Sequence, residues 1–167
     1  MRAIPREDDL TIAVLEADDI HLGDGTYRFS MKSTYEEIDN VMSPIDAFLE
    51  NQIAGKLDTI LTSTAIREAL LNAVEHGNKK IMDRFVDIEL IPLPGKLEVI
   101  ISDEGPGFDY NLYKKQVLKH KDDAIQGRGL FALEKVVSRL DVQGGSVKLT
   151  FPLESDGPPG KLQGGRS

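Results

Sequence analysis

The sequence contains no cysteine, so disulfide bonds, thiolate catalysis and cysteine-based zinc sites are all excluded. The absence is compatible with a reducing compartment. No apolar run approaches the roughly 18 residues that a membrane-spanning helix needs, and the N-terminus lacks the basic and apolar segments of a signal peptide. We therefore expect a soluble, cytoplasmic protein that does not associate with a membrane.

Positive charge is also scarce, because 20 Lys and Arg residues stand against 28 Asp and Glu residues and give a formal net charge of −8. A surface of this sign repels phosphate backbones and anionic lipids, which argues against nucleic-acid and membrane-surface partners. A polyanion would have to be bound locally, through a metal ion and main-chain amides. The length of 167 residues suits one domain.

The domain is predicted to span residues 26–153, after an N-terminal extension of residues 1–25 and before a disordered tail of residues 154–167. Short strands are predicted at residues 10–15 and 26–32. A helix follows, for which Ser33 and Glu36 are predicted to form a capping box. Pro44 predicts a kink in this helix, or a restart with Ser43 as N-cap.

The next helix is predicted to begin between Asp58 and Ser63, and its stretch at residues 67–78 carries an apolar stripe and two polar residues that point to chemistry. Glu68 and Asn72 are four residues apart, so their side chains lie on one flank. A carboxylate and a carboxamide so placed can hold a hard cation and orient a hydroxyl group. Gly77 and Asn78 are predicted to end the helix. A plain amphipathic helix is the alternative interpretation.

The hydrophobic period then changes from 3.6 to 2, which predicts a hairpin with one buried face from Val86 to Ile101. Continuing the alternation places Asp103 on the buried face, where an aspartate is costly unless a donor bonds to it. Gly105 and Gly107 complete a D-x-G-x-G pattern, which lets a flat ligand approach the backbone. An aspartate that accepts only from neighbouring main-chain amides is the alternative.

Residues 109–126 are predicted to form a lid, and their lysines either meet phosphate oxygens or are simply solvated. The sequence Gly127-Arg128-Gly129 then opens an amphipathic helix over residues 130–140. The free amides and the dipole at the start of a helix favour phosphate, although a glycine-bearing helix start without any ligand is equally consistent with the pattern. A final hairpin is predicted over residues 140–153.

Three motifs in fixed order, E-x-x-x-N-x-x-x-H-G, D-x-G-x-G and G-x-G, resemble the Bergerat ATP-binding fold of the GHKL superfamily. The resemblance covers about residues 26–153. It implies an α+β, two-layer fold whose mixed, mostly antiparallel sheet is covered on one face by helices. Within the superfamily, the short lid and the Gly-Arg-Gly-Leu-Phe wording look most like the anti-sigma-factor serine kinases of sporulation and general-stress switches.

The resemblance also implies roles for particular residues. Asn72 would hold Mg²⁺ that bridges the phosphates of ATP, and Glu68 would accept the proton of the attacking hydroxyl group. Asp103 would accept from the adenine amino group. The remaining implied nucleotide contacts are the pocket glycines Gly105 and Gly107, the phosphate-binding residues Gly127, Arg128 and Gly129, and a hydroxyl group from either Ser146 or Thr150.

By the same resemblance, the expected activity is an ATP-dependent protein serine/threonine kinase that regulates transcription by partner switching. Its expected partners are a sigma factor and a STAS-like anti-anti-sigma protein whose serine is phosphorylated, and a homodimer is a further expected state. Pro44 lies in the helix that such proteins use for partners or pairing. The alternatives are a histidine-kinase-type catalytic domain, an ATP-gated binding protein without phosphotransfer, a nucleic-acid-dependent ATPase, and an α/β domain without nucleotide.

Overall fold

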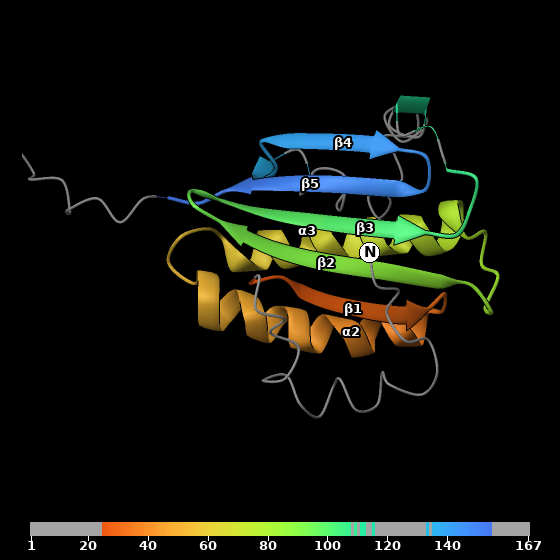
Figure 1. Cartoon of the computed structure of the whole chain (residues 1–167), viewed down its shortest axis with the longest axis horizontal. Coiled ribbons are helices and arrows are strands. Elements are labelled where there is room, and N and C mark those ends of the chain that lie inside the picture. The colour runs from red at the N-terminus through yellow and green to blue at the C-terminus, as the bar shows by residue number, and fades with distance from the viewer. Residues whose placement is uncertain are drawn as a thin grey trace, which may run out of the picture.

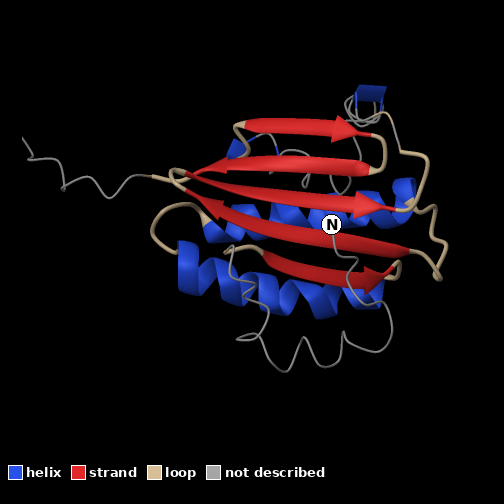
Figure 2. Cartoon of the chain, viewed as in Figure 1, coloured by secondary structure: helices blue, strands red, loops and turns tan. Residues whose placement is uncertain are grey.

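The computed structural model describes residues 25–107, 109, 111, 112, 115, 133 and 135–154. Five strands form one antiparallel sheet in the order β1-β2-β3-β5-β4, and two long helices cover one of its faces (Figures 1 and 2). The elements are β1 (Tyr27–Lys32), α2 (Tyr35–Phe48), α3 (Thr59–Asn72), β2 (Phe85–Leu93), β3 (Lys96–Asp103), β4 (Arg139–Gln143) and β5 (Ser146–Pro152), with single π-helical turns η1 (Leu49–Ile53) after α2 and η2 (Ala73–Gly77) after α3. The predicted two-layer α+β fold is confirmed.

The start of α2 lies one residue later than the sequence predicts. Thr34, not Ser33, is the N-cap, and its hydroxyl oxygen accepts from the backbone N–H of Glu37 at 3.3 Å. Ser33 belongs to the preceding strand connection, because its N–H donates to the carbonyl oxygen of Arg84 at 2.9 Å. Both residue pairs have the spacing of a capping box, and the strand pairing decides between them.

The predicted restart at Ser43 is wrong, because α2 runs without a break through Pro44 to Phe48. A proline inside a helix costs about 3 kcal/mol through a lost hydrogen bond and a clash. Buried apolar side chains lie on both sides of the proline, including Met42 before it and Ile45 after it. Each contributes roughly 1.5–3 kcal/mol, so the packing of the continuous face exceeds the cost of the proline.

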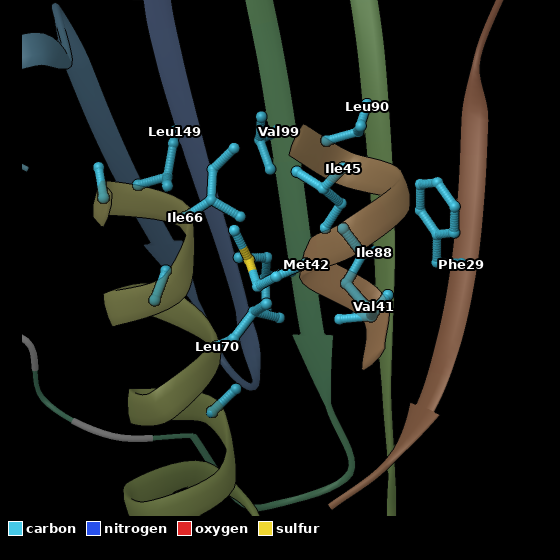
Figure 3. Packing of buried hydrophobic residues seen from close by; sticks show 14 of the residues in the cluster. Phe29, Val41, Met42, Ile45, Ile66, Leu70, Ile88, Leu90, Val99 and Leu149 are labelled. Atoms are coloured by element: carbon cyan, nitrogen blue, oxygen red, sulfur yellow. The ribbon is translucent and has the colours of Figure 1, made fainter. Parts of the chain in front are cut away.

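The core lies between the two helices and the covered face of the sheet. Figure 3 shows side chains of α2 and α3, among them Met42, Ile45 and Ile66, meeting side chains of the sheet such as Val99 and Leu149. α3 begins after Asp58, whose carboxylate accepts from the N–H of Leu61 at 2.9 Å, inside the predicted range. None of the described helices is long and apolar enough to cross a membrane.

Both predicted hairpins are present. In β2 and β3 the predicted alternation is confirmed, since Val86, Ile88, Leu90, Leu97, Val99 and Ile101 are all buried. The turn between them is Pro94–Gly95, with Gly95 at φ +73°. The turn between β4 and β5 is Gly144–Gly145, as predicted. The helix predicted over residues 130–140 ends earlier, because β4 starts at Arg139.

Candidate functional site

The end of α3, the turn η2 and the end of β3 lie at the same end of the molecule (Figure 1). There the backbone surrounds the carboxylate of Asp103. A Cβ atom added to Gly77 would lie 2.1 Å from Oδ2 of Asp103, and one added to Gly105 or Gly145 would lie 2.9 Å from Oδ1. Three glycines from separate parts of the chain therefore leave a carboxylate walled by main chain.

Asp103 has few donors within the described part of the chain. Its Oδ1 accepts from the N–H of Gly105 at 2.8 Å, while no hydrogen bond to Oδ2 is found among the described residues. Burial raises the pKa of the Asp103 carboxyl group, and the Gly105 amide and the charge of Arg84 offset this only in part. An oxygen of this kind is suited to accept from a ligand N–H.

The two glycines of the D-x-G-x-G pattern are required by close backbone approach. A Cβ atom at Gly105 would lie 1.8 Å from the carbonyl oxygen of Gly77. Gly107 adopts φ +86°, and a Cβ atom there would lie 2.4 Å from the carbonyl oxygen of Gly144. The loop after β3 therefore packs closely against the backbone of η2 on one side and of the β4–β5 turn on the other.

The second half of the candidate site lies on α3. Asn72 is the last residue of this helix and is only 4% exposed, and Glu68 lies one turn earlier and is partly exposed. The shared flank predicted for the two residues follows from the observed helix. No hydrogen bond of the Asn72 carboxamide is found among the described residues.

The donor set on α3 fits Mg²⁺ only together with phosphate. A carboxamide oxygen is a suitable ligand for this hard cation, which usually takes one or two protein groups and completes its shell with water and phosphate oxygens. Within the described ranges no group of three or more His, Cys, Asp or Glu residues is placed to hold a metal ion. The predicted role of Asn72 therefore requires the nucleotide.

The sequence interpretation missed the role of Asn78, which it took only as a helix stop. This residue is fully buried, and its Nδ2 donates to the carbonyl oxygen of Phe85 at 2.9 Å. Its Oδ1 accepts from the N–H of Glu104, the residue after Asp103, also at 2.9 Å. Asn78 thus joins the end of η2 to the loop that carries the aspartate. The only signal in the sequence was its position directly after Gly77, and that position does not reveal its hydrogen-bond partners.

Ser146 and Thr150 are not brought to the side of the sheet that Asp103 occupies. They alternate with the buried Val147 and Leu149 of β5, so they face away from the helices. The hydroxyl oxygen of Ser146 lies 3.0 Å from that of Ser102 on the neighbouring strand. The geometry gives no support to a contact between either hydroxyl group and a ligand at Asp103.

Several predicted features lie outside the described residues. These are the phosphate-binding residues Gly127, Arg128 and Gly129, most of the predicted lid at 109–126, the predicted strand at 10–15, nearly all of the N-terminal extension and the tail beyond residue 154. The described part of the candidate site therefore consists of the α3 flank, the η2 turn and the glycine-walled aspartate.

Residues 31–151 match the family model of the histidine kinase-like ATPase domain. The chain is 35% identical over 102 residues to the serine-protein kinase RsbW of Bacillus subtilis (strain 168), which covers 55% of this chain and 63% of that protein. It is 33% identical over 95 residues to the serine-protein kinase RsbW of Listeria monocytogenes serotype 4a (strain HCC23), covering 52% and 60%. The chain thus spans about three-fifths of the length of these curated relatives.

Proposed function

Because the chain belongs to the family of histidine kinase-like ATPase domains, we propose that it binds ATP between the end of α3 and the glycine-walled Asp103. We propose further that it transfers the γ-phosphoryl group to a serine of a protein. The adenine amino group would donate to Oδ2 of Asp103, which has no donor among the described residues. This carboxylate, desolvated and enclosed by three glycines, is the observation that carries the proposal.

The proposed chemistry needs few protein groups, since phosphoryl transfer depends on positioning and on neutralising phosphate charge. Asn72 would hold Mg²⁺, which supplies that neutralisation when ATP is bound. Glu68 would accept the proton from the serine hydroxyl group as the bond between its oxygen and the γ-phosphorus forms. The bond between the γ-phosphorus and the β,γ-bridging oxygen breaks, and ADP leaves. The amides of Gly127, Arg128 and Gly129 are proposed to contact the phosphates.

The printed name of the relatives, serine-protein kinase, supports serine as the phosphate acceptor. We propose that the substrate is a STAS-like anti-anti-sigma protein and that the chain also binds a sigma factor, so that phosphorylation regulates transcription by partner switching. A homodimer is proposed as its working state. The ordered domain would be residues 26–153, with residues 1–25 as an extension and 154–167 as a tail.

The test combines the full chain with labelled ATP, Mg²⁺ and purified candidate anti-anti-sigma proteins, and mass spectrometry locates the new phosphate. Glu68→Gln is expected to lower the rate at least about 100-fold, the size of a lost general base, while calorimetry finds ATP affinity unchanged within a few-fold. Glu36→Gln, at an exposed glutamate in the first turn of α2, is the matched control and should keep the full rate.

Three outcomes would replace this proposal. A chain that does not bind ATP at millimolar concentrations has no kinase function of this kind. A chain that binds ATP and holds a partner only in the ATP-bound form, with no phosphoprotein product, is an ATP-gated binding protein. Transfer to a histidine of a separate protein would assign the chain to the histidine-kinase type instead.

A further inference from the structure

The segment between η2 and β2 carries a local excess of positive charge. Residues 79–84, which we call the lysine loop, contain Lys79, Lys80 and Arg84 but only one carboxylate, that of Asp83. The whole chain has a net charge of −8. A local excess of positive charge on an acidic protein attracts acidic partners.

The backbone of this loop is strained and firmly held. Lys79 (φ 54°) and Lys80 (φ 59°) are consecutive left-handed residues, and they are the only non-glycine residues with positive φ in the described chain. Each costs on the order of 1–2 kcal/mol relative to a right-handed residue. The N–H of Lys80 donates to the carbonyl oxygen of Val74 at 2.8 Å. The N–H of Ile81 donates to the backbone carbonyl oxygen of Asn78 at 3.1 Å. Strain held in this way is typical of functional segments.

Large apolar side chains are exposed at the same place. Ile81 is 44% exposed and Met82 is 64% exposed, and both follow directly after the strained lysines. Tyr35, which is 48% exposed, adjoins them, because Nζ of Lys80 lies 5.9 Å from the centre of its ring. Its hydroxyl group donates to the carboxylate of Glu75 at 2.6 Å, which orients the ring. Fixed aromatic rings and adaptable methionines are common anchors in protein interfaces.

The lysine loop lies beside the candidate nucleotide site. Asn78, directly before the loop, accepts from the N–H of Glu104, which follows Asp103. At the other end of the loop, the carbonyl oxygen of Arg84 accepts from the N–H of Ser33, which lies between β1 and α2. Figure 1 shows this loop at the same end of the molecule as the end of β3. A partner bound here is therefore close to the loop of the carboxylate that is proposed to bind the adenine.

We propose that Tyr35, Lys79, Lys80, Ile81 and Met82 form a docking surface for a protein partner that presents an acidic segment with apolar side chains. Carboxylates of the partner pair with the two lysines, and its apolar groups cover Ile81, Met82 and the ring of Tyr35. The strained backbone presents these groups in fixed positions, which lowers the entropy lost on binding. Where the partner is the phosphorylated protein, this inference rests on the proposed kinase function.

The first test uses a fluorescein-labelled peptide of alternating glutamate and leucine, with a lysine and leucine peptide of equal length as the charge control. Fluorescence anisotropy with the full chain should show binding of the acidic peptide alone, weakening as salt is added. Lys79→Glu with Lys80→Glu should weaken binding at least about tenfold, and Met82→Ser several-fold. Ile60→Ser, at a 77% exposed residue near the opposite end of α3, should have no effect.

A second variant separates docking from folding. Lys79→Gly with Lys80→Gly removes two lysine side chains and also relieves the left-handed strain, so the melting temperature should stay the same or rise while peptide binding falls. Unchanged binding in both lysine variants would overturn the proposal. Equal binding of the acidic and basic peptides, or an equal loss in Ile60→Ser, would also overturn it.

A third measurement distinguishes failure of docking from failure of the proposed function. With the phosphorylated protein as substrate, Lys79→Glu with Lys80→Glu should raise KM at least tenfold and leave kcat and ATP affinity unchanged. If no phosphotransfer is found and the acidic peptide still binds as described, the kinase function is wrong and the docking surface stands. If phosphotransfer is found with an unchanged KM in this variant, the docking surface is wrong and the kinase stands.

Discussion

Glu98 and Asp103 lie on the same strand, β3, and face opposite sides of the sheet. Their surroundings shift the pKa values of the two carboxyl groups in opposite directions. Glu98 accepts from Nζ of Lys96 at 2.7 Å and of Lys148 at 3.1 Å, and these bonds hold its pKa below the usual range. Burial holds the pKa of Asp103 above its usual range, because one backbone amide and the charge of Arg84 do not compensate for lost water.

The difference separates a carboxylate that is compensated within the sheet from one that is a candidate ligand-binding group. The charge of Glu98 is neutralised within the chain, so it needs no ligand and its loss affects only the sheet. Burial makes the charge of Asp103 unfavourable, and a group retained at such a cost is a candidate binding group.

Gly105→Ala should disrupt the main-chain wall around Asp103 and so abolish tight ATP binding. The new Cβ atom would lie 1.8 Å from the carbonyl oxygen of Gly77, so the loop after β3 must move away from η2. We expect ATP affinity to fall at least about 100-fold and the free energy of unfolding to fall by about 1–3 kcal/mol, as in other overpacked sites. Calorimetry and thermal unfolding measure the two effects.

The control for this change is Gly95→Ala in the β2–β3 turn. Gly95 has φ +73° with no atom within 4 Å of an added Cβ, so the substitution strains only the backbone, at a cost of about 1–2 kcal/mol. ATP affinity should be unchanged in this variant. If Gly105→Ala bound ATP as well as Gly95→Ala does, the close contact between Gly77 and Gly105 would have no part in the site.

Asp103→Asn should separate binding from stability. The variant removes a hydrogen bond between the ligand and a charged group, worth about 1.5–3 kcal/mol, so ATP affinity should fall about 10- to 100-fold. The melting temperature should rise slightly, because the neutral side chain avoids the desolvation that raises the pKa of Asp103. A variant that lost stability and kept its ATP affinity would make Asp103 a structural residue.

Much of the contrast could be predicted from the sequence. Alternation from Leu97 placed Asp103 on the buried face, because a strand has a period of two and β3 continues without a bulge to Asp103. The i, i+4 spacing placed Glu68 and Asn72 on one flank for the equivalent reason in a helix. Patterns of this kind depend on local geometry alone, so tertiary structure does not alter them.

Other features of the candidate site could not be predicted, because they depend on contacts between segments that are far apart in the sequence. Gly77 and Gly145 lie 26 residues before and 42 residues after Asp103, and no periodicity connects them with it. The choice between Ser33 and Thr34 as N-cap likewise depended on a hydrogen bond to Arg84 in a distant strand connection. The side of the sheet occupied by Ser146 follows from strand register, which the family resemblance did not supply.

Glu98→Gln should give the smallest effect and the opposite dependence on pH. ATP affinity should be unchanged, and the free energy of unfolding should fall by about 1 kcal/mol or less, as for other partly exposed ion pairs. The lowered pKa of Glu98 means that its contribution is present at neutral pH and is lost as the pH falls below the unfolded value, about 4.3, through the lower folded value. The melting temperatures of wild type and variant should therefore converge in acid.

The melting temperature of Asp103→Asn should also converge with that of the wild type in acid, but here the variant is the more stable protein at pH 7. Its raised pKa means that the wild type gains relative stability as the pH falls and Asp103 becomes protonated, so the advantage of the variant should disappear. Melting curves of both variants from pH 7 to pH 3 thus compare a compensated and an uncompensated carboxylate directly. Two differences of the same sign at pH 7 would show that the two carboxylates are equivalent and would remove the reason for assigning only Asp103 to the site.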